Sequence, residues 1–238
     1  MRILAFETSA KSSSVALLEE DRLLGEYYQN SGLTHSVTLM KMAENLLENC
    51  GLTPSHITAV GCAAGPGSFT GVRIGVAAAK GFAWGRSLPC VGVSTLEAMA
   101  QGARTFHGLI CCTMDARRQQ VYNALFTCEN GKLTRFSEDR AISLEELEKE
   151  LKKVEIPKII VGDGAQLCYN TIGSTLPGVS LAPEHLRMQR ASGVALAARD
   201  LLLTGADFSG AALEPTYLRL SQAERERNER LKMNEGEA

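Results

Sequence analysis

Short apolar runs and longer amphipathic runs alternate along the first hundred residues. Three short runs, at residues 3–6, 14–18 and 23–28, have the length and composition of strands. Residues 35–50 then place apolar side chains at helical spacing, and Gly51 follows as a stop that helices favour. The elements predicted next are a strand at 57–64, a helix to Gly85, a short strand at 90–93 and a helix from Ser94 or Thr95 to about Arg104.

A similar order begins again in the second half of the chain. Its second and third strands are joined by a hairpin signal, and its helix opens on a capping box. The predicted elements are strands at 109–114, 121–126 and from Lys132, the Asn130-Gly131 turn, a helix from the Ser143 and Glu146 capping box to Lys153, and a strand at 159–161. The pattern βββαβα therefore occurs twice, and an acidic residue, Glu7 or Asp115, ends the first strand of each copy.

This duplicated pattern predicts an α/β protein with two RNase H-like lobes, the organisation of the actin, Hsp70 and sugar-kinase superfamily. We expect a first lobe at residues 1–106 and a second at 107–220. A further helix at 192–204, apolar on one face and ended by Gly205, could pack back on the first lobe. Residues 221–238 alternate acidic and basic side chains with almost no apolar surface, which predicts a frayed helix or a flexible tail.

The turn between the strand at 57–64 and the following helix has a distinctive sequence. It is Gly-Pro-Gly-Ser-Phe-Thr-Gly-Val-Arg-Ile-Gly over residues 65–75, and its glycines permit a tight bend. We expect Thr70, in preference to Ser68, to cap the helix. Free N–H groups at a helix start attract anions. The candidate anion-binding residues are Gly65, Gly67, Ser68, Thr70, Gly71 and Arg73.

This turn lacks the sequence of the common phosphate-binding loops. A P-loop needs Gly-Lys-Ser or Gly-Lys-Thr where this chain has Gly-Val-Arg at 71–73, and the dinucleotide fingerprint needs a glycine at the position of Thr70. A turn that only joins strand to helix is therefore at least as good an interpretation as an anion site. Because Arg73 lies at the positive end of the helix, we expect a compensating group: Glu7, Glu97, a partner's carboxylate or an anion.

Composition narrows the class of protein. The chain has 238 residues, a net charge of −2 and 45% hydrophobic residues, which is typical of a globular protein without a strong nucleic-acid-binding field. Seven cysteines without a C-x-x-C spacing argue against a disulfide framework or a zinc cluster, and for a reducing cytoplasm. The apolar start meets Glu7 too early for a signal peptide, and no apolar run approaches the length of a membrane span.

Few side chains are arranged for chemistry. Glu7 and Asp115 could face a cleft as a pair of acids, or each could cap a turn or pair with a nearby arginine, and the second interpretation is favoured. We interpret the segment Gly162-Asp163-Gly164 as an ordinary turn. The four histidines have neither i, i+4 spacing nor an H-E-x-x-H motif, and there is no G-x-S-x-G turn. We therefore assign no catalytic residue and no metal ligand.

Residues 65–75 resemble the G-P-G-S-F-T-G-x-R-I-G motif of the TsaB (YeaZ) family, bacterial proteins of tRNA threonylcarbamoyladenosine biosynthesis. The likeness extends over most of residues 1–220. Glu7 departs from the family pattern, in which aspartate is commoner. The other matching segments are 3–9, His35-Ser36, 91–96, Asp115-Ala116-Arg117 and 215–219.

The resemblance implies a non-catalytic subunit. The catalytic relative TsaD carries an H-x-x-x-H metal pair, whereas this chain has Thr95 and Met99 at the nearest equivalent positions. A TsaB protein binds TsaD and supports transfer of threonylcarbamoyl from threonylcarbamoyl-AMP to the adenosine 3′ of the anticodon in tRNAs that read ANN codons. The ATPase TsaE completes the assembly, tRNA is met only through the complex, and no cofactor is implied, with weak nucleotide binding left open. The alternative is a self-sufficient enzyme of the superfamily, either an ATP-dependent transferase or a glycoprotease-type metallopeptidase.

The helices at 35–50 and 70–85 carry more apolar surface than one contact with a sheet requires. Burial of both sides within the chain is one explanation, and a face for a partner is the other. The resemblance favours a face that packs against the matching helices of TsaD and forms a two-fold homodimer when the chain is alone. The expected interface residues are Val37, Met40, Leu47, Gly71, Gly75 and Ala78.

Overall fold

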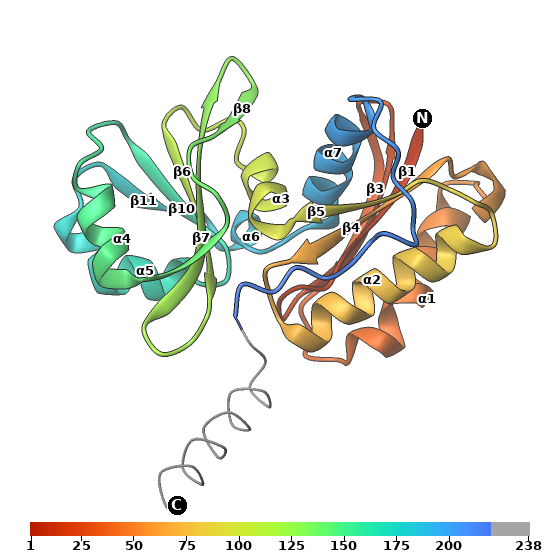
Figure 1. Cartoon of the computed structure of the whole chain (residues 1–238), viewed down its shortest axis with the longest axis horizontal. Coiled ribbons are helices and arrows are strands. Elements are labelled where there is room, and N and C mark those ends of the chain that lie inside the picture. Colours follow the sequence, from red (N-terminus) through yellow and green to blue (C-terminus); the bar gives the residue numbers. More distant parts are fainter. Residues whose placement is uncertain (220–238) are drawn as a thin grey trace, which may run out of the picture.

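The computed structural model describes residues 1–219, so the segment predicted as a charged tail, 221–238, lies outside the described residues. Two β-sheets stand side by side, with helices on both faces of each (Figure 1). The sheets share the helices between them, so the lobes are joined by a packed layer. None of the helices in residues 1–219 is long and apolar enough to cross a membrane.

The first sheet consists of the five strands that the apolar runs predicted. They are Arg2–Glu7 (β1), Ser13–Glu19 (β2), Arg22–Gln29 (β3), Ala59–Gly65 (β4) and Cys90–Ser94 (β5). Their order is β3-β2-β1-β4-β5, with β1 antiparallel to β2 and parallel to β4. The central strand β1 and its parallel neighbour β4 are buried on both faces, which explains why their sequences are continuously apolar.

The second sheet repeats this arrangement. Its strands are Leu109–Asp115 (β6), Gln120–Glu129 (β7), Lys132–Arg135 (β8), Arg140–Ser143 (β9), Lys158–Val161 (β10) and Val179–Leu181 (β11). The order β8-β7-β6-β10-β11 matches that of the first sheet strand for strand, and β9 pairs with the start of β7. The duplicated pattern is confirmed, and the fold is the two-lobed architecture of the actin, Hsp70 and sugar-kinase superfamily. The short strands β9 and β11 were not predicted.

Helices form three layers around the two sheets. They are His35–Asn49 (α1), Phe69–Trp84 (α2), Thr95–Gly102 (α3), Leu144–Leu151 (α4), Ala165–Ile172 (α5), Glu184–Arg187 (α6) and Ala191–Leu202 (α7). α1 and α2 cover the outer face of the first sheet, and α4 and α5 cover the outer face of the second. α3 and α7 lie between the sheets (Figure 1).

Local signals placed several element ends correctly. Gly51 has φ +67° and follows Cys50, the C-cap of α1, in the left-handed conformation expected of a helix stop. Asn130 and Gly131 have φ +52° and +76° in the β7–β8 hairpin, as a type I′ turn requires. Ser143 and Glu146 form the capping box at the start of α4.

The middle layer exchanges helices between the lobes. α7 follows the last strand of the second sheet but packs on the first, where Val194 and Ala198 lie over the open surface of Gly61 in β4. α3 follows the last strand of the first sheet but places Leu96 and Met99 in the core of the second. Each sheet is therefore covered by a helix that follows the last strand of the other sheet.

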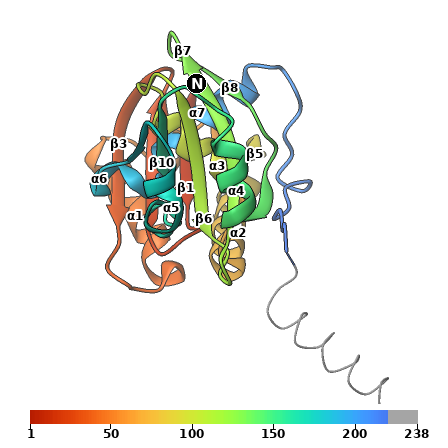
Figure 2. The same cartoon turned by 90° about the vertical axis from the view of Figure 1, so that its left-hand side faces the viewer.

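After α7 the chain crosses the first lobe as a segment that we call the C-terminal strap, residues 206–219. It is the blue trace that ends between the lobes in Figure 1, and Figure 2 shows it along one side of the molecule. Thr216 N donates to Ala64 O at 2.6 Å, and Leu213 is buried against Gly92. The strap thus adds the end of the described chain to the edge of the first sheet and brings it to the second lobe.

Replacing Gly193 by alanine should disturb the crossing of α3 and α7. A Cβ at Gly193 would lie 2.0 Å from the carbonyl oxygen of Ala98, and a backbone atom inside a helix cannot move aside. We expect Gly193→Ala to lower the free energy of unfolding by about 2 kcal/mol or more, measured by urea denaturation. Gly102→Ala is the matched control, because no heavy atom of residues 1–219 lies within 4 Å of its Cβ, and it should be neutral or slightly stabilising. Equal destabilisation by both changes would contradict the close crossing.

Candidate functional site

The glycine-rich turn packs its backbone directly on the loop that follows β1. A Cβ at Gly71 would lie 2.1 Å from Thr8 O, and one at Gly67 would lie 2.5 Å from Ser9 O. Two hydrogen bonds fix this crossing: Thr8 Oγ1 donates to Gly71 O at 2.7 Å, and Ser68 N donates to Ser9 O at 2.7 Å. These glycines therefore serve a close backbone contact within the chain.

Ser68, and not Thr70, caps α2. Ser68 has φ −59° and ψ 122°, and its Oγ accepts a hydrogen bond from Gly71 N at 3.3 Å. The preference for Thr70 was wrong because the contact with the β1–β2 loop starts the helix at Phe69. Thr70 is left inside the first helical turn, where it is exposed.

A cleft of about 480 Å³ opens between the lobes beside this turn. The first lobe contributes the β1–β2 loop, the start of α2 and the strap, and the second lobe contributes the β6–β7 turn and the loop after β10. The lining residues are Ser9, Ala10, Lys11, Gly67, Ser68, Phe69, Thr70, Met114, Asp115, Ala116, Arg117, Tyr122, Asp163, Thr216, Tyr217, Leu218 and Arg219. Among the candidate anion-binding residues, Gly67, Ser68 and Thr70 line the cleft, whereas Gly65 and Gly71 are buried behind it.

Glu7 and Asp115, the two candidate cleft acids, lie in different environments. Asp115 is exposed and lines the cleft, and its Oδ1 accepts a hydrogen bond from Arg117 N at 2.7 Å. Glu7 is fully buried: its Oε1 accepts from Ser9 N at 2.6 Å, and its Oε2 has no hydrogen-bond partner in residues 1–219. Burial raises the pKa of Glu7 to about 7, hydrogen bonding by Ser9 opposes the shift, and the charge of Asp163 adds to it. Glu7 and Asp115 are therefore not a pair exposed to one cleft.

Asp163 is the cleft acid that the sequence pattern missed. It lies in the loop after β10 that was interpreted as an ordinary turn. Burial raises the pKa of Asp163, and Gln189 Nε2, which donates to its Oδ1 at 2.7 Å, opposes the shift. Because β10 is parallel to β6 and next to it, the ends of both strands reach the same edge of the sheet. The sequence signal that could have indicated Asp163 was an acid two residues after a parallel strand.

Within residues 1–219, aromatic rings and not a carboxylate compensate Arg73. Its guanidinium carbon lies 3.9 Å from the centroid of the Phe69 ring, and its Nε donates to the hydroxyl of Tyr217 at 2.9 Å. Phe69 and Tyr217 stack with centroids 4.6 Å apart. The expected partners are engaged elsewhere, since Glu7 is buried and Glu97 forms an ion pair with the second lobe. Tyr217 could not be foreseen because the strap brings it from the far end of the chain.

On α1, two of the three expected interface residues are exposed and the third is buried. Val37 and Met40 are 76% and 46% exposed. Leu47 is only 3% exposed and packs in the core of the first lobe, which corrects its assignment to an interface. Leu46 and Leu47 are both buried, so α1 packs a wide apolar face on the sheet.

On α2, the glycines expected to allow close approach of a partner helix are covered by other residues of this chain. Gly71 and Gly75 are buried, and a Cβ at Gly75 would lie 2.5 Å from Thr8 Oγ1. Their assignment to an intermolecular interface is therefore corrected. Ala78 is half-buried beside the same core.

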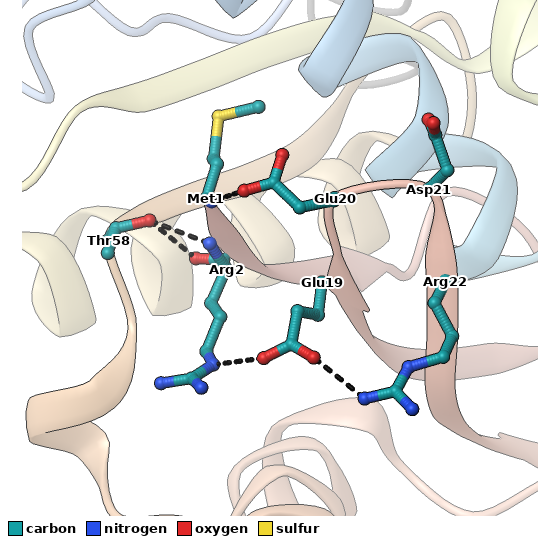
Figure 3. Close-up of a pocket in the computed structure, with 7 residues that line it drawn as sticks. All are labelled: Met1, Arg2, Glu19, Glu20, Asp21, Arg22 and Thr58. Carbon is teal, nitrogen blue, oxygen red and sulfur yellow. Dashed lines mark hydrogen bonds and ion pairs between the residues drawn. The ribbon is translucent and has the colours of Figure 1, made fainter.

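A second hollow, of about 810 Å³, lies at the opposite end of the first sheet (Figure 3). Its charged groups already have partners, and Asp21 pairs with Arg199 of α7. Glu19 accepts from Arg2 Nε at 2.6 Å and from Arg22 at 2.7 Å, and the amino group of Met1 pairs with Glu20. Its charges are already satisfied, so we place the candidate site in the interlobe cleft.

Glu7→Gln should remove a pH dependence of stability. The unfolded chain releases this proton near pH 4.5 and the folded chain near pH 7, so the folded state holds more protons between these values. The free energy of unfolding should fall as pH rises through this window, by up to about 3 kcal/mol. Glutamine cannot ionise, so the variant should gain stability relative to the native chain as pH rises to 7 and keep that gain above it.

The measurement is urea denaturation of both proteins from pH 5 to pH 8. Asp115→Asn serves as the control for the loss of one carboxylate, since Asp115 is exposed at the same cleft. A constant difference between Glu7→Gln and the native chain across this range would mean that Glu7 is ionised throughout.

Comparisons with known proteins extend the likeness to more than nine-tenths of the chain. The family model "TsaD: tRNA N6-adenosine threonylcarbamoyltransferase" matches residues 29–226. A "tRNA threonylcarbamoyladenosine biosynthesis protein TsaB" of Bacillus subtilis is 37% identical and covers 94% of this chain and 96% of its own length. The protein of the same name from Escherichia coli is 32% identical, with 92% and 95% covered.

Among solved structures, "YeaZ from Pseudomonas aeruginosa" has a TM-score of 0.73 and 25% identity, covering 91% of this chain and 99% of the other. An uncharacterised Pseudomonas aeruginosa protein, described as similar to the peptidase YeaZ, has a TM-score of 0.75 and 26% identity, with 92% and 99% covered. Sequence and fold agree over the full length of these relatives, and the chain belongs to the TsaB (YeaZ) family of tRNA threonylcarbamoyladenosine biosynthesis proteins.

Proposed function

We propose that this chain is a non-catalytic scaffold and activating subunit for tRNA threonylcarbamoyl transfer. Its partner is the catalytic paralogue TsaD, which moves threonylcarbamoyl from threonylcarbamoyl-AMP to the adenosine 3′ of the anticodon in tRNAs that read ANN codons. The observation that carries the proposal is an apolar surface on α1 and α2. The match of a TsaD family model to most of the chain supports it, because two proteins of one fold can pair equivalent helices.

We define the α1–α2 face as Val37, Met40, Ala77, Gly81 and Trp84. Val37 and Trp84 are 76% and 77% exposed, which is high for large apolar side chains. Ala77 and Gly81 are also exposed, and a Cβ at Gly81 would meet no heavy atom of residues 1–219 within 4 Å. The α2 backbone is therefore open to close approach by another helix at this point, as Gly71 and Gly75 are not.

The same two helices are fixed on their inner sides. Leu39 and Leu46 of α1 and Val72 and Val76 of α2 are buried in one core cluster with the first sheet. A face held in this way loses little conformational freedom when a partner binds, which favours affinity. Because the face is apolar on both helices, a second copy of the chain and TsaD would compete for it. A specific interface there would need to bury at least ~1,000 Å² of surface. The ATPase TsaE completes the proposed assembly, which we place in the cytoplasm.

Charge on the α1–α2 face should abolish association without unfolding the chain. Val37→Arg and Met40→Glu replace exposed apolar side chains, so we expect unchanged thermal stability. Burying either charge in an apolar interface is costly, so the homodimer should become a monomer in light scattering and TsaD binding should weaken at least about 10-fold in titration. Emission of Trp84, the only tryptophan, gives an independent reading of homodimer burial.

Leu203→Glu is the matched control, because Leu203 is equally exposed but follows α7 and is not part of the face. It should leave mass and TsaD binding unchanged. A folded Met40→Glu protein that still forms dimers and binds TsaD normally would place the interface elsewhere.

The alternative is a self-sufficient enzyme, either an ATP-dependent transferase or a glycoprotease-type metallopeptidase. Thr95 and Met99, which stand nearest to the metal histidines of the catalytic relative, are both buried. Across residues 1–219, no group of three His, Cys, Asp or Glu side chains is placed to hold a metal ion. We propose that the chain needs no cofactor of its own.

We expect the purified chain to hold much less than one iron or zinc per molecule and to modify no tRNA alone, since a hydroxyl and a thioether do not replace two imidazole ligands. Elemental analysis and a modification assay with TsaD, with and without this chain, measure both. One tightly bound metal per chain, or modification without TsaD, would favour the enzyme.

A further inference from the structure

Five basic side chains lie in or beside the lining of the interlobe cleft, and we call them the basic rim. Lys11, Arg117 and Arg219 line the cleft, Arg118 follows Arg117 in the β6–β7 turn, and Arg73 contacts the lining residues Phe69 and Tyr217. They come from the β1–β2 loop, α2, the β6–β7 turn and the strap, so both lobes contribute. None of the five forms an ion pair within residues 1–219, although most other arginines there do. Positive charge that is not neutralised locally is available to an anionic partner.

The β6–β7 turn holds two of these arginines in an unfavourable backbone conformation. Arg117, Arg118 and Gln119 have φ of +62°, +55° and +59°, in the left-handed region that glycine adopts more easily. Gln120 N donates to Arg117 O at 3.2 Å, and Leu144 N donates to Gln119 O at 3.1 Å, so the turn is well fixed. Glycine would suit this backbone better, and the two arginines are therefore best explained by what their side chains bind.

An exposed aromatic surface lies beside the rim. Tyr217 lines the cleft and keeps 40% of its surface exposed while it stacks on Phe69. Arg73 contacts both rings, and its guanidinium is held 3.9 Å from the centroid of Phe69. Aromatic rings and guanidinium planes are the surfaces on which unpaired RNA bases stack.

Acidic side chains lie in the same cleft. Asp163 and Asp115 line it, and the buried Glu7 lies close enough for its pKa to respond to Asp163. A phosphate beside the half-buried Asp163 would meet carboxylates, whereas phosphates on the exposed Arg73, Arg117 and Arg118 would meet positive charge. This distribution favours a ligand with several phosphates spread over the rim rather than a mononucleotide with its phosphates inside.

We propose that the basic rim and Tyr217 bind a single-stranded loop of RNA, with its phosphates on the rim and one unpaired base on the exposed part of the Tyr217 ring. The inference deepens the proposed function and rests on it, because membership of a tRNA-modifying family favours RNA over other polyanions. Phosphate contacts position the RNA, and stacking tolerates different bases. The chain would thus contact the tRNA directly, and not only through the complex as the resemblance implied, while the α1–α2 face holds the transferase.

The test is binding of a fluorescent, unmodified tRNA anticodon stem–loop to the full-length chain, followed by anisotropy between about 50 and 200 mM salt. The double variant Arg117→Gly/Arg118→Gly removes two rim charges, and glycine suits the left-handed turn, so the protein should fold. We expect the native chain to bind and the variant to bind roughly 10-fold or more weakly. The slope of log K against log salt should become shallower by about 1.4, as expected for two lost contacts to a single strand.

Two further variants separate charge from stacking. Tyr217→Leu should lower affinity about 5-fold or more and leave the salt slope unchanged, since it removes no charge. Lys132→Ala/Lys153→Ala is the charge-matched control, because both lysines are exposed and neither lines the cleft, and it should bind as the native chain does. Absence of binding at low salt, an equal loss in the control, or displacement of the RNA by equimolar ATP would overturn the proposal.

Co-purification with TsaD distinguishes this inference from the function on which it rests. Arg117 and Arg118 lie outside the α1–α2 face, so their double variant should still bind TsaD. A native chain that binds TsaD but no RNA would leave the scaffold role standing and overturn the RNA site. A native chain that binds RNA through the rim but not TsaD would support the site and overturn the scaffold role.

Discussion

Three backbone segments cross in close contact at the end of the first sheet, and this crossing positions both the start of α2 and the interlobe cleft. Gly71 and Gly67 meet the β1–β2 loop, and Gly65 meets the strap, where a Cβ would lie 2.2 Å from Thr216 O. Only residues without a side chain allow this approach. The crossing starts α2 at Phe69, sets the position of the β1–β2 loop and brings the strap to the cleft.

A second consequence is that the two lobes share their interior. α3 completes the core of the second sheet, and α7 completes the core of the first. The strap ties the first lobe to the second through the hydrogen bond from Arg219 to Ala116 O. Neither sheet is fully covered without the opposite lobe. The outer sides of α1 and α2 take no part in this interlocking, and their exposed apolar side chains form the face on which we propose that a partner binds.

Within residues 1–219, the acids and the basic side chains of the cleft form no ion pairs with one another. Burial raises the pKa of Glu7 to about 7 and also raises that of Asp163, although the charge of Lys11 opposes the second shift. The guanidinium of Arg73 is surrounded by the rings of Phe69 and Tyr217 and not by a carboxylate. The cleft thus combines two acids whose pKa is raised by burial with basic side chains that no carboxylate of the described residues neutralises.

Local dihedral preferences and hydrophobic periodicity were enough to predict the duplicated strand and helix order, the Gly51 stop, the Asn130-Gly131 hairpin and the α4 capping box. The distinctive turn of the sequence was also sufficient to indicate the family. Only the tertiary structure decided that Ser68 caps α2, that Leu47 is core, that Gly75 faces Thr8 and that Tyr217 contacts Arg73. These features depend on which distant backbones meet, and a one-dimensional pattern of apolar and polar residues contains no information on that meeting.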